Sequence, residues 1–491
     1  MPSIGQTNTL SPLSPKTAII RSESQKSNKA REFRQLGEAL EYLGDRKRTI
    51  MIHRGDATGD VSHVLAWKSK NPDGAIIVIG DKKNIADTFA NDFNLHQDCC
   101  FLNTSGETSG LTKQVENLQT VLSCSINPAS AEEKYSNFDH IEQFPSPHPQ
   151  DCYTALTVTD ATREFTSDLR QEEINAASTI LRGPDYNPEE PTAKDIALVE
   201  MIDKLGIKTD KDTVIFWCRQ SGSRGGQYPE QDHSSAFLFQ TAVKLTSKDF
   251  NEGKNFNVII AGDFNTTSPD MHDKQTLKLA QSQNREGCGN VTIIGEFWNK
   301  EEWTESDTSL GRQDQTRMFY ILSELLQSKG HKLVHTGPRS GGIDMYGLGG
   351  QSTVYLLNTK PGGTPSLNRR LDGVTKAFKT ATTNDSFRKV DVTTRVFGKM
   401  RDMPKGFNRG DSLDRLILKQ KEDTGKTPGQ TIQEYSTYDV VDGRGKVIRT
   451  SNVLEKSNKK SSSPDTMNIV TFARKNQLED FVDQIKDLST E

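Results

Sequence analysis

The first apolar run of the chain is followed by a turn that gathers residues able to bind or deprotonate a ligand. In "TIMIHRGDATGDVSHV" (49–64) two carboxylates, an arginine and a histidine surround two glycines, whereas a plain chain reversal needs only a glycine or two. The residues concerned are Arg54, Gly55, Asp56, Gly59, Asp60 and His63. Asp60 stands where the next helix begins, so it is either the helix cap or a general base that takes a proton from a ligand.

The elements around this turn would place it at the edge of a parallel sheet. The β-branched run 49–53, the helical pattern 61–70 and the fully apolar run 75–80 predict a strand–helix–strand unit. Ligands of open α/β sheets bind at the carboxyl ends of the strands, and a helix N-terminus there favours an anion. We therefore predict that Gly55 and Gly59 let the backbone approach a ligand closely.

Strands and helices alternate through the second half of the chain as well. Strands are predicted at 213–218, 257–262, 290–295, 332–337 and 352–357, and a helix at 315–330. Because the same alternation occurs on both sides of a polar linker (181–191), the pattern predicts two doubly wound, Rossmann-like α/β domains. We expect the first domain over residues 31–185 and the second over 186–395.

Three helical patterns predict which side chains are buried or cap a helix. One predicted face consists of Phe33, Leu36, Ala39, Leu40 and Leu43 and ends at Gly44, and another consists of Ile196, Val199, Ile202 and Leu205. The second follows a cap-like pair, Thr192 and Asp195. In "GRQDQTR" (311–317), Arg312 and Asp314 are expected to mark a helix start, with a place in a cleft as the alternative.

The loop after the strand at 332–337 has the composition of a diphosphate-binding loop. "TGPRSGG" (336–342) offers backbone N–H groups, a hydroxyl and a guanidinium to a pyrophosphate, and two arginines follow the strand at 213–218. These groups could offset the charge that develops on a departing diphosphate without a metal ion. The predicted donor-binding residues are Arg219, Arg224, Asp263, Thr336, Gly337, Arg339, Ser340, Gly341, Gly342 and Asp344.

The segment "IHRGDATGDVSHVLAWKSKNPDGAIIVIG" (52–80) resembles the opening of the ADP-heptose:lipopolysaccharide heptosyltransferase family. The family's apolar strand, G-D-V turn, helix, proline segment and second strand correspond to "TIMIH", Gly59-Asp60-Val61, "SHVLAWKSK", Asn71-Pro72-Asp73-Gly74 and "AIIVIG". The resemblance implies the GT-B arrangement, in which two doubly wound domains face each other across a cleft. It also implies that Asp60 is the general base for the acceptor hydroxyl and that the turn 54–63 is an acceptor-side loop.

The resemblance continues in "VIFWCRQSGSRGGQYPEQD" (214–232) and "VHTGPRSGGIDMYGLGGQSTVYLL" (334–357), which are similar to the family's nucleotide-sugar domain. His335 stands where the family has an aspartate, its helix histidine has no clear counterpart, and Gly341-Gly342 add length. The implied activity is metal-independent transfer of a sugar from a nucleotide-sugar donor to a hydroxyl or other nucleophile. No cofactor is expected besides the nucleotide sugar, which is a co-substrate.

Two other functions remain open from the residues. "GDFN" (262–265) looks like the metal-binding turn of endonuclease/exonuclease/phosphatase enzymes, with Asp263 and Asn265 as Mg²⁺ ligands, which would make the chain a phosphoesterase or nuclease. Its nearest "DH" turn, at 232–233, comes before "GDFN", in the wrong order for that family. A catalytically inactive GT-B-like interaction protein is the third possibility. The D-x-D at 210–212 precedes its strand, and Cys99-Cys100 has no neighbouring base, so both are expected to be structural.

Composition limits the partners and the compartment. Net charge is −4, with 62 basic and 66 acidic residues, so there is no electrostatic footprint for nucleic acid. Six cysteines without a CxxC pair favour a reducing compartment, here the cytoplasm, and no run is long and apolar enough for a membrane span. Residues 1–30 are expected to be a disordered, solvated tail, with a leader for export into a host cell without a Sec signal peptide as the alternative.

The last part of the chain, 396–491, is expected to be a polar extension that ends in an amphipathic helix. One stripe of that helix contains Leu478, Phe481, Val482, Ile485 and Leu488. We expect this stripe to pack on the body of the protein, with a partner-binding helix as the alternative.

Overall fold

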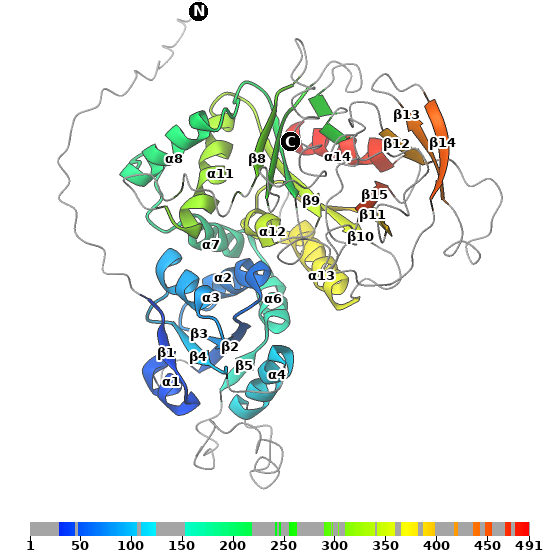
Figure 1. Cartoon of the computed structure of the whole chain (residues 1–491). Coiled ribbons are helices and arrows are strands. Elements are labelled where there is room, and N and C mark those ends of the chain that lie inside the picture. Colours follow the sequence, from blue (N-terminus) through cyan, green and yellow to red (C-terminus); the bar gives the residue numbers. More distant parts are fainter. Residues whose placement is uncertain are drawn as a thin grey trace, which may run out of the picture.

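The protein consists of two α/β domains and a small antiparallel sheet (Figure 1). The computed structural model describes residues 29–44, 48–105, 110–123, 153–218, 241–242, 245–246, 255–262, 289–295, 297, 303, 310–338, 341–358, 365–381, 386–397, 417–420, 436–441, 447–453, 467–472 and 477–490. Residues 1–28 of the predicted leader and the "GDFN" turn from Asp263 onward lie outside these residues.

The sheet of the first domain is parallel throughout, with the strand order β1-β4-β3-β2-β5. Its strands are β1 (Arg31–Phe33), β2 (Thr49–Arg54), β3 (Ala75–Gly80), β4 (Cys99–Asn103) and β5 (Thr154–Leu156). Alternate side chains of the central strands enter two different cores, as in β3, where Ile77 joins one core and Val78 the other. The sheet is therefore buried on both faces, as its continuous apolar runs predict.

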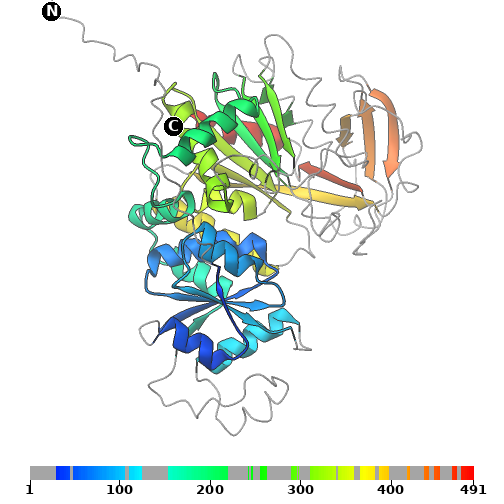
Figure 2. The same ribbon diagram turned by 60° about the vertical axis from the view of Figure 1, so that its left-hand side comes forward.

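Helices cover both faces of this sheet (Figure 2). They are α1 (Leu36–Leu43), α2 (Val61–Lys70), α3 (Asn84–Asp87) with the adjoining helical segment η2 (Thr88–Asp92), α4 (Leu111–Leu122) and α6 (Val158–Thr166). Helices α1 and α4 cover the face away from the second domain, while α2, α3 and α6 lie toward it (Figure 1). Phe33 was wrongly predicted to be helical: it ends the edge strand β1, and α1 begins after it at Leu36.

The second sheet has seven strands in the order β15-β11-β10-β9-β6-β7-β8. They are β6 (Thr213–Cys218), β7 (Asn257–Gly262), β8 (Val291–Gly295), β9 (Leu333–Pro338), β10 (Thr353–Asn358), β11 (Phe387–Phe397) and β15 (Met467–Phe472). The six strands from β8 to β11 are parallel and have the 3-2-1-4-5-6 order of doubly wound dinucleotide-binding sheets. The predicted fold class, two doubly wound α/β domains, is therefore confirmed.

The C-terminal part of the chain completes the second domain. Strand β15 adds an antiparallel edge beside β11, and helix α14 (Gln477–Thr490) packs on one face of the sheet. Its residues Phe481, Val482, Ile485 and Leu488 join the core formed by alternate side chains of the strands. The packed position expected for this helix is confirmed. A separate antiparallel sheet of β12 (Ile417–Gln420), β13 (Ser436–Val441) and β14 (Val447–Val453) lies away from the first domain (Figure 1).

Three helices connect the domains: α7 (Gln171–Arg182), α8 (Ala193–Lys204) and α11 (Arg312–Gln327). Helix α7 packs on α2 of the first domain and on α11, and α11 packs on α8. Helices α12 (Gly341–Gly347) and α13 (Pro365–Ala381) also touch the first domain, at α2 and α6. One apolar core runs from Trp67 and Phe89 of the first domain through Leu181 to Trp217 of the second.

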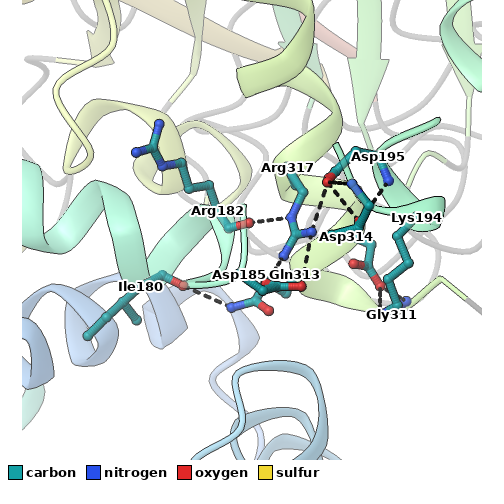
Figure 3. A network of polar contacts seen from close by, with 10 residues as sticks. Ile180, Arg182, Asp185, Lys194, Asp195, Gly311, Gln313, Asp314 and Arg317 are labelled. Carbon is teal, nitrogen blue, oxygen red and sulfur yellow. Dashed lines mark hydrogen bonds and ion pairs between the residues drawn. The ribbon is translucent and has the colours of Figure 1, made fainter. Parts of the chain in front are cut away.

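A buried arginine holds the connection between α7, α8 and α11 (Figure 3). The Arg317 guanidinium is 1% exposed, and it donates to Asp195 (3.1 Å), to the carbonyl of Arg182 (2.6 Å) and to Asp185. Asp195 also accepts from Thr192 in the predicted cap of α8. This network joins the linker between the domains to the helix α11.

The predicted buried face of α8 is confirmed except at its first residue. Ile202 is buried and Val199 and Leu205 pack on the core, whereas Ile196 is 50% exposed. The helix turns Asp195 toward α11, because a buried guanidinium without a carboxylate partner is very unfavourable. Asp314 of α11 marks the helix start, as predicted: it accepts from the backbone of Gly311 and from Lys194.

Two expected structural features are also found. The side chain of Asp210 accepts from Lys211 and Asn257, and Asp212 accepts from the Lys332 backbone, so this turn joins the amino ends of three strands. The Cys99 and Cys100 thiols are buried in β4, and burial raises the pKa of Cys100 to about 12. Among the described residues, no helix combines the length and apolar character needed to cross a membrane.

Candidate functional site

Each of the two loops predicted to carry function starts beside the switch point of its own sheet. The strand order of each sheet reverses direction at its first central strand, between β2 and β5 in one domain and between β6 and β9 in the other. Loops at such a switch point splay apart at the carboxyl ends of the strands and form the usual ligand crevice of an open α/β sheet. The turn after β2 and the loop after β9 both start there.

In the first domain, the turn after β2 holds its arginine rigidly. Arg54 makes a two-pronged ion pair with Asp56 (2.9 and 2.8 Å) and also donates to Thr112 of α4 (2.9 Å). This hydrogen bond to Arg54 holds the pKa of Asp56 below its usual value. The Arg54 side chain is 40% exposed, so it lies at the surface while it is paired with Asp56 and Thr112.

Gly55 has a different reason to be glycine from the one predicted. Its N–H donates to the Ile79 carbonyl (2.7 Å), and a β-carbon at this position would lie 2.9 Å from the Lys82 carbonyl. The Gly55 backbone therefore approaches the segment of chain that follows β3. Its hydrogen bond to Ile79 continues the pairing of β2 with β3 beyond the end of β2.

Asp60 occupies the N-cap position of α2 without using its side chain as the cap. It ends the short helical turn η1 (Thr58–Asp60), and no side-chain capping hydrogen bond is formed to the first turn of α2. The capping interpretation of Asp60 is therefore wrong in its usual form. The side chain is half-buried at the start of the helix, close enough to His53 to raise the pKa of that imidazole.

The two switch-point loops touch each other through glycines. A β-carbon built on Gly341, at the start of α12, would lie 2.4 Å from Cα of Gly59 and 2.7 Å from its carbonyl oxygen. A β-carbon on Gly59 would meet Gly341 only at 3.7 Å, an ordinary contact. The domains thus meet directly at the two places where the sequence predicts acceptor and donor loops.

A buried polar contact between the domains lies beside these glycines. His63 Nε2 lies 3.3 Å from Asp344 Oδ2, and both side chains are 3% exposed. The other imidazole nitrogen faces the Thr162 hydroxyl (3.1 Å), and Tyr355 donates to Asp344 Oδ1 (2.8 Å). His63 and Asp344 were predicted to lie on opposite sides of the site, and the structure brings them together in the interface.

Several predicted donor-binding groups take part in internal contacts. The Thr336 hydroxyl donates to the Val354 carbonyl (2.8 Å), and Gly337 has a φ of 151° and lies against the Trp217 backbone. Gly342 follows Gly341 in α12. The predicted residues Arg219, Arg224, Asp263, Arg339 and Ser340 lie outside the described residues.

His335 has a structural role in the core of the second domain. Its ring stacks on Tyr346 (4.2 Å between centroids), accepts from the Trp217 indole (3.1 Å) and faces the Gln351 amide oxygen (2.8 Å). These partners fix a neutral tautomer with the proton on Nε2. Burial lowers the pKa of His335 to about 3.

Replacing His335 by phenylalanine should destabilise the fold and reduce its sensitivity to acid. At pH 7.5 we expect a loss of about 1–3 kcal/mol, because the indole loses its acceptor and Gln351 its donor. Between pH 6.5 and about 3 the unfolded chain binds a proton at His335 that the folded chain does not, so this group makes stability rise with pH. His335→Phe should therefore flatten the dependence of Tm on pH between 6.5 and 4, as followed by circular dichroism.

The control for this variant is His331→Asn, which changes a partly exposed histidine just before β9. It should leave the Tm at pH 7.5 nearly unchanged. An unchanged Tm in His335→Phe would contradict the structural role.

Sequence reasoning missed two groups that contact the site and a third that joins the two domains. Thr162 and Tyr355 bind predicted residues, but nothing in their local patterns indicates this. The third group, Asp92, accepts from the Arg312 backbone (3.2 Å), so the first domain contributes to the start of α11. Burial raises the pKa of Asp92. In the described part of the chain, no cluster of three or more His, Cys, Asp or Glu side chains is placed to hold a metal ion.

Comparison with known proteins gives only distant structural likenesses. No protein-family model and no curated protein sequence matches the chain. Among solved structures, it is similar to Escherichia coli ADP-heptose lipopolysaccharide heptosyltransferase II, at 10% identity and a TM-score of 0.28, over 65% of this chain and 87% of that one. The chain is also similar to E. coli heptosyltransferase WaaC with ADP-2-deoxy-2-fluoro heptose, at 9% identity and a TM-score of 0.24, over 65% of this chain and 91% of that one. A third similar structure is Neisseria meningitidis UDP-GlcNAc 2-epimerase bound to UDP-GlcNAc, at 11% identity and a TM-score of 0.27, over 69% of this chain and 95% of that one.

Proposed function

We propose that the protein is a glycosyltransferase that moves a sugar from a nucleotide-sugar donor to a hydroxyl or other nucleophilic acceptor. The first domain binds the acceptor, the second binds the donor, and no metal ion takes part. The observation that carries this proposal is the meeting of the two switch-point loops at Gly59 and Gly341. A reaction between two substrates, each held at the crevice of its own sheet, needs this juxtaposition.

Asp60 is the general base in this proposal. Its carboxylate stands at the start of α2 next to the contact between the loops, and it is not used to cap the helix. A carboxylate in that place can take the proton of an acceptor hydroxyl as the oxygen attacks the anomeric carbon of the donor. The bond from that carbon to the diphosphate breaks in the same displacement, and the nucleoside diphosphate leaves.

The donor side rests on the backbone and arginines of the loop after β9. The side chains of Thr336 and Asp344 are engaged within the protein, so backbone N–H groups together with Arg339 and Ser340 are the proposed diphosphate ligands. Arg219 and Arg224 are proposed to approach the same group from the loop after β6. Their positive charge would offset the negative charge that develops on the leaving diphosphate.

The first experiment is a calorimetric and thermal-shift screen of ADP-, GDP-, UDP- and dTDP-sugars, with and without Mg²⁺. A donor should raise the Tm without metal, and Arg339→Ala should weaken its binding. No binding by any donor, with Mg²⁺-dependent release of phosphate or nucleotides instead, would favour the phosphoesterase alternative. Absence of both activities would favour the inactive interaction protein.

Asp60→Asn tests the chemical step separately. It should lower the rate of transfer by about 10²–10⁴-fold, as expected for loss of a general base, and leave donor binding unchanged. The matched control is Asp73→Asn, which alters an exposed aspartate in the turn between α2 and β3 and should transfer normally. Equal rates in the Asp60→Asn variant and the wild type would rule out this residue as the base.

A further inference from the structure

The structure contains a buried imidazole with no evident structural role. His53, the residue before Arg54 in β2, is 0% exposed. In the described part of the chain, neither of its ring nitrogens has a hydrogen-bond partner. Buried polar groups are nearly always hydrogen-bonded, so a ring that lacks both a donor and an acceptor contact needs an explanation. An apolar residue would fill the same space at no such cost.

His53 lies on the face of β2 that packs toward α2 and Phe89. Side chains alternate along a strand, so His53 points to the same face as Met51, which joins the core formed with Val64 of α2 and Phe89. The Phe89 ring meets the imidazole edge-on, 5.5 Å away between centroids. His53 therefore stands between the apolar core and the turn that contains Asp60.

Charged groups of the turn after β2 influence the pKa of the ring. Burial lowers the pKa of His53 to about 4, so the ring is neutral at pH 7. Among the charged neighbours Asp60 opposes this shift most strongly, and Asp56 also raises the pKa, while the Arg54 charge lowers it. The Arg54 backbone lies near the ring and raises the pKa as well, but it does not meet hydrogen-bond geometry with either nitrogen.

We propose that His53 is a positioning residue for Asp60, whose carboxylate accepts a hydrogen bond from an imidazole N–H when the site is occupied. The inference rests on the proposed function, because it explains how the general base is oriented. A carboxylate on a short side chain rotates about two bonds, and a donor anchored in the core of the sheet would fix the oxygen that faces the acceptor. The need for this donor explains a polar residue within the apolar strand "TIMIH".

The contact can be tested without any turnover. Spectra of the full chain with ¹⁵N-labelled imidazoles contain signals from nine histidines, and the His53 signals are identified as those missing in His53→Phe. Asp60→Asn should shift the His53 signals, alone or with UDP-glucose, ADP-glucose, GDP-mannose or dTDP-glucose present. If the His53 signals are the same in Asp60→Asn and wild type under all these conditions, the inference is overturned.

Measurements of transfer rate and of Tm distinguish a positioning role of His53 from a role in packing. His53→Phe should match or exceed the wild-type Tm, because it removes an unpartnered polar ring, yet transfer should fall about tenfold or more. The acid limb of its pH–rate profile should move to higher pH, because a carboxylate that loses a hydrogen-bond donor has a higher pKa. His53→Gln, which keeps an N–H donor, should recover part of the rate.

Phe89→Leu is the control for packing at the same place. It should lower the Tm and leave the pH–rate profile where it is. Wild-type rates and an unshifted profile in His53→Phe would overturn the inference even if transfer itself is established. If the wild type transfers no sugar but the His53 signals of Asp60→Asn differ from those of the wild type more strongly with a nucleotide sugar than without one, the contact stands and the proposed function alone fails.

Discussion

Arg317→Met should lower the free energy of unfolding by about 3–5 kcal/mol, because it leaves the buried Asp195 carboxylate without its cation. Methionine is long enough to fill most of the space but cannot donate to Asp195 or to the Arg182 carbonyl. The loss should be seen as a lower midpoint in urea unfolding and a lower Tm. It should be among the largest effects of a single substitution in this protein, since Arg317 joins α11 to both helices of the linker (Figure 3).

Two comparisons make the Arg317 experiment specific. Arg163→Ala removes an arginine that is 75% exposed and pairs with Asp160, and it should change stability by less than about 1 kcal/mol. Adding Asp195→Asn to Arg317→Met removes the buried charge while keeping an acceptor for Thr192, so the double variant should recover much of the loss. A double variant no more stable than Arg317→Met would mean that the lost packing, and not the unpaired carboxylate, causes the effect.

Gly341→Ala should separate the two switch-point loops. The new methyl group would lie 2.4–2.9 Å from three backbone atoms of Gly59, and neither backbone can move aside as a flexible side chain would. We expect a loss of about 1–3 kcal/mol in stability, as for an overpacked interior site. If the proposed function holds, transfer should fall by up to about 10²-fold, because reacting groups must be placed within about an ångström.

The same contact supplies its own control. In Gly59→Ala the methyl group would meet Gly341 at 3.7 Å, so stability and donor binding should be close to those of the wild type. Both variants can be compared by thermal unfolding and by small-angle scattering, where only Gly341→Ala should change the scattering profile. Equal behaviour of the two variants would contradict the described approach of the loops.

The elements were predictable because their signals are local. Short continuous apolar runs such as 75–80 and 257–262 are typical of strands that are covered on both faces. The strands β3 and β7 have the same bounds as these two runs. The stripe of α14 and the cap at Thr192 depend on residues three or four positions apart, and both are present. Where a residue's environment depends only on its own helix or strand, the sequence is enough to predict that environment.

The site was less predictable because its contacts join distant parts of the chain. His63 and Asp344 are separated by 281 positions, and only the packing of the domains brings them within 3.3 Å. The contact of Asp195 in α8 with Arg317 was missed for the same reason, since the two residues are 122 positions apart. The glycines of the turn approach other backbone segments of the protein, and their approach to a ligand stays a prediction.

The position of α14 in the sequence has a consequence for how the protein is made. The first sheet is complete once residue 156 has left the ribosome, so this domain can begin to fold during synthesis. One face of the second sheet, with Val214, Phe216 and Val258, is covered by residues 481–488, which are translated more than two hundred positions later. That part of the apolar face stays without α14 during the intervening translation, when exposed apolar surface favours aggregation.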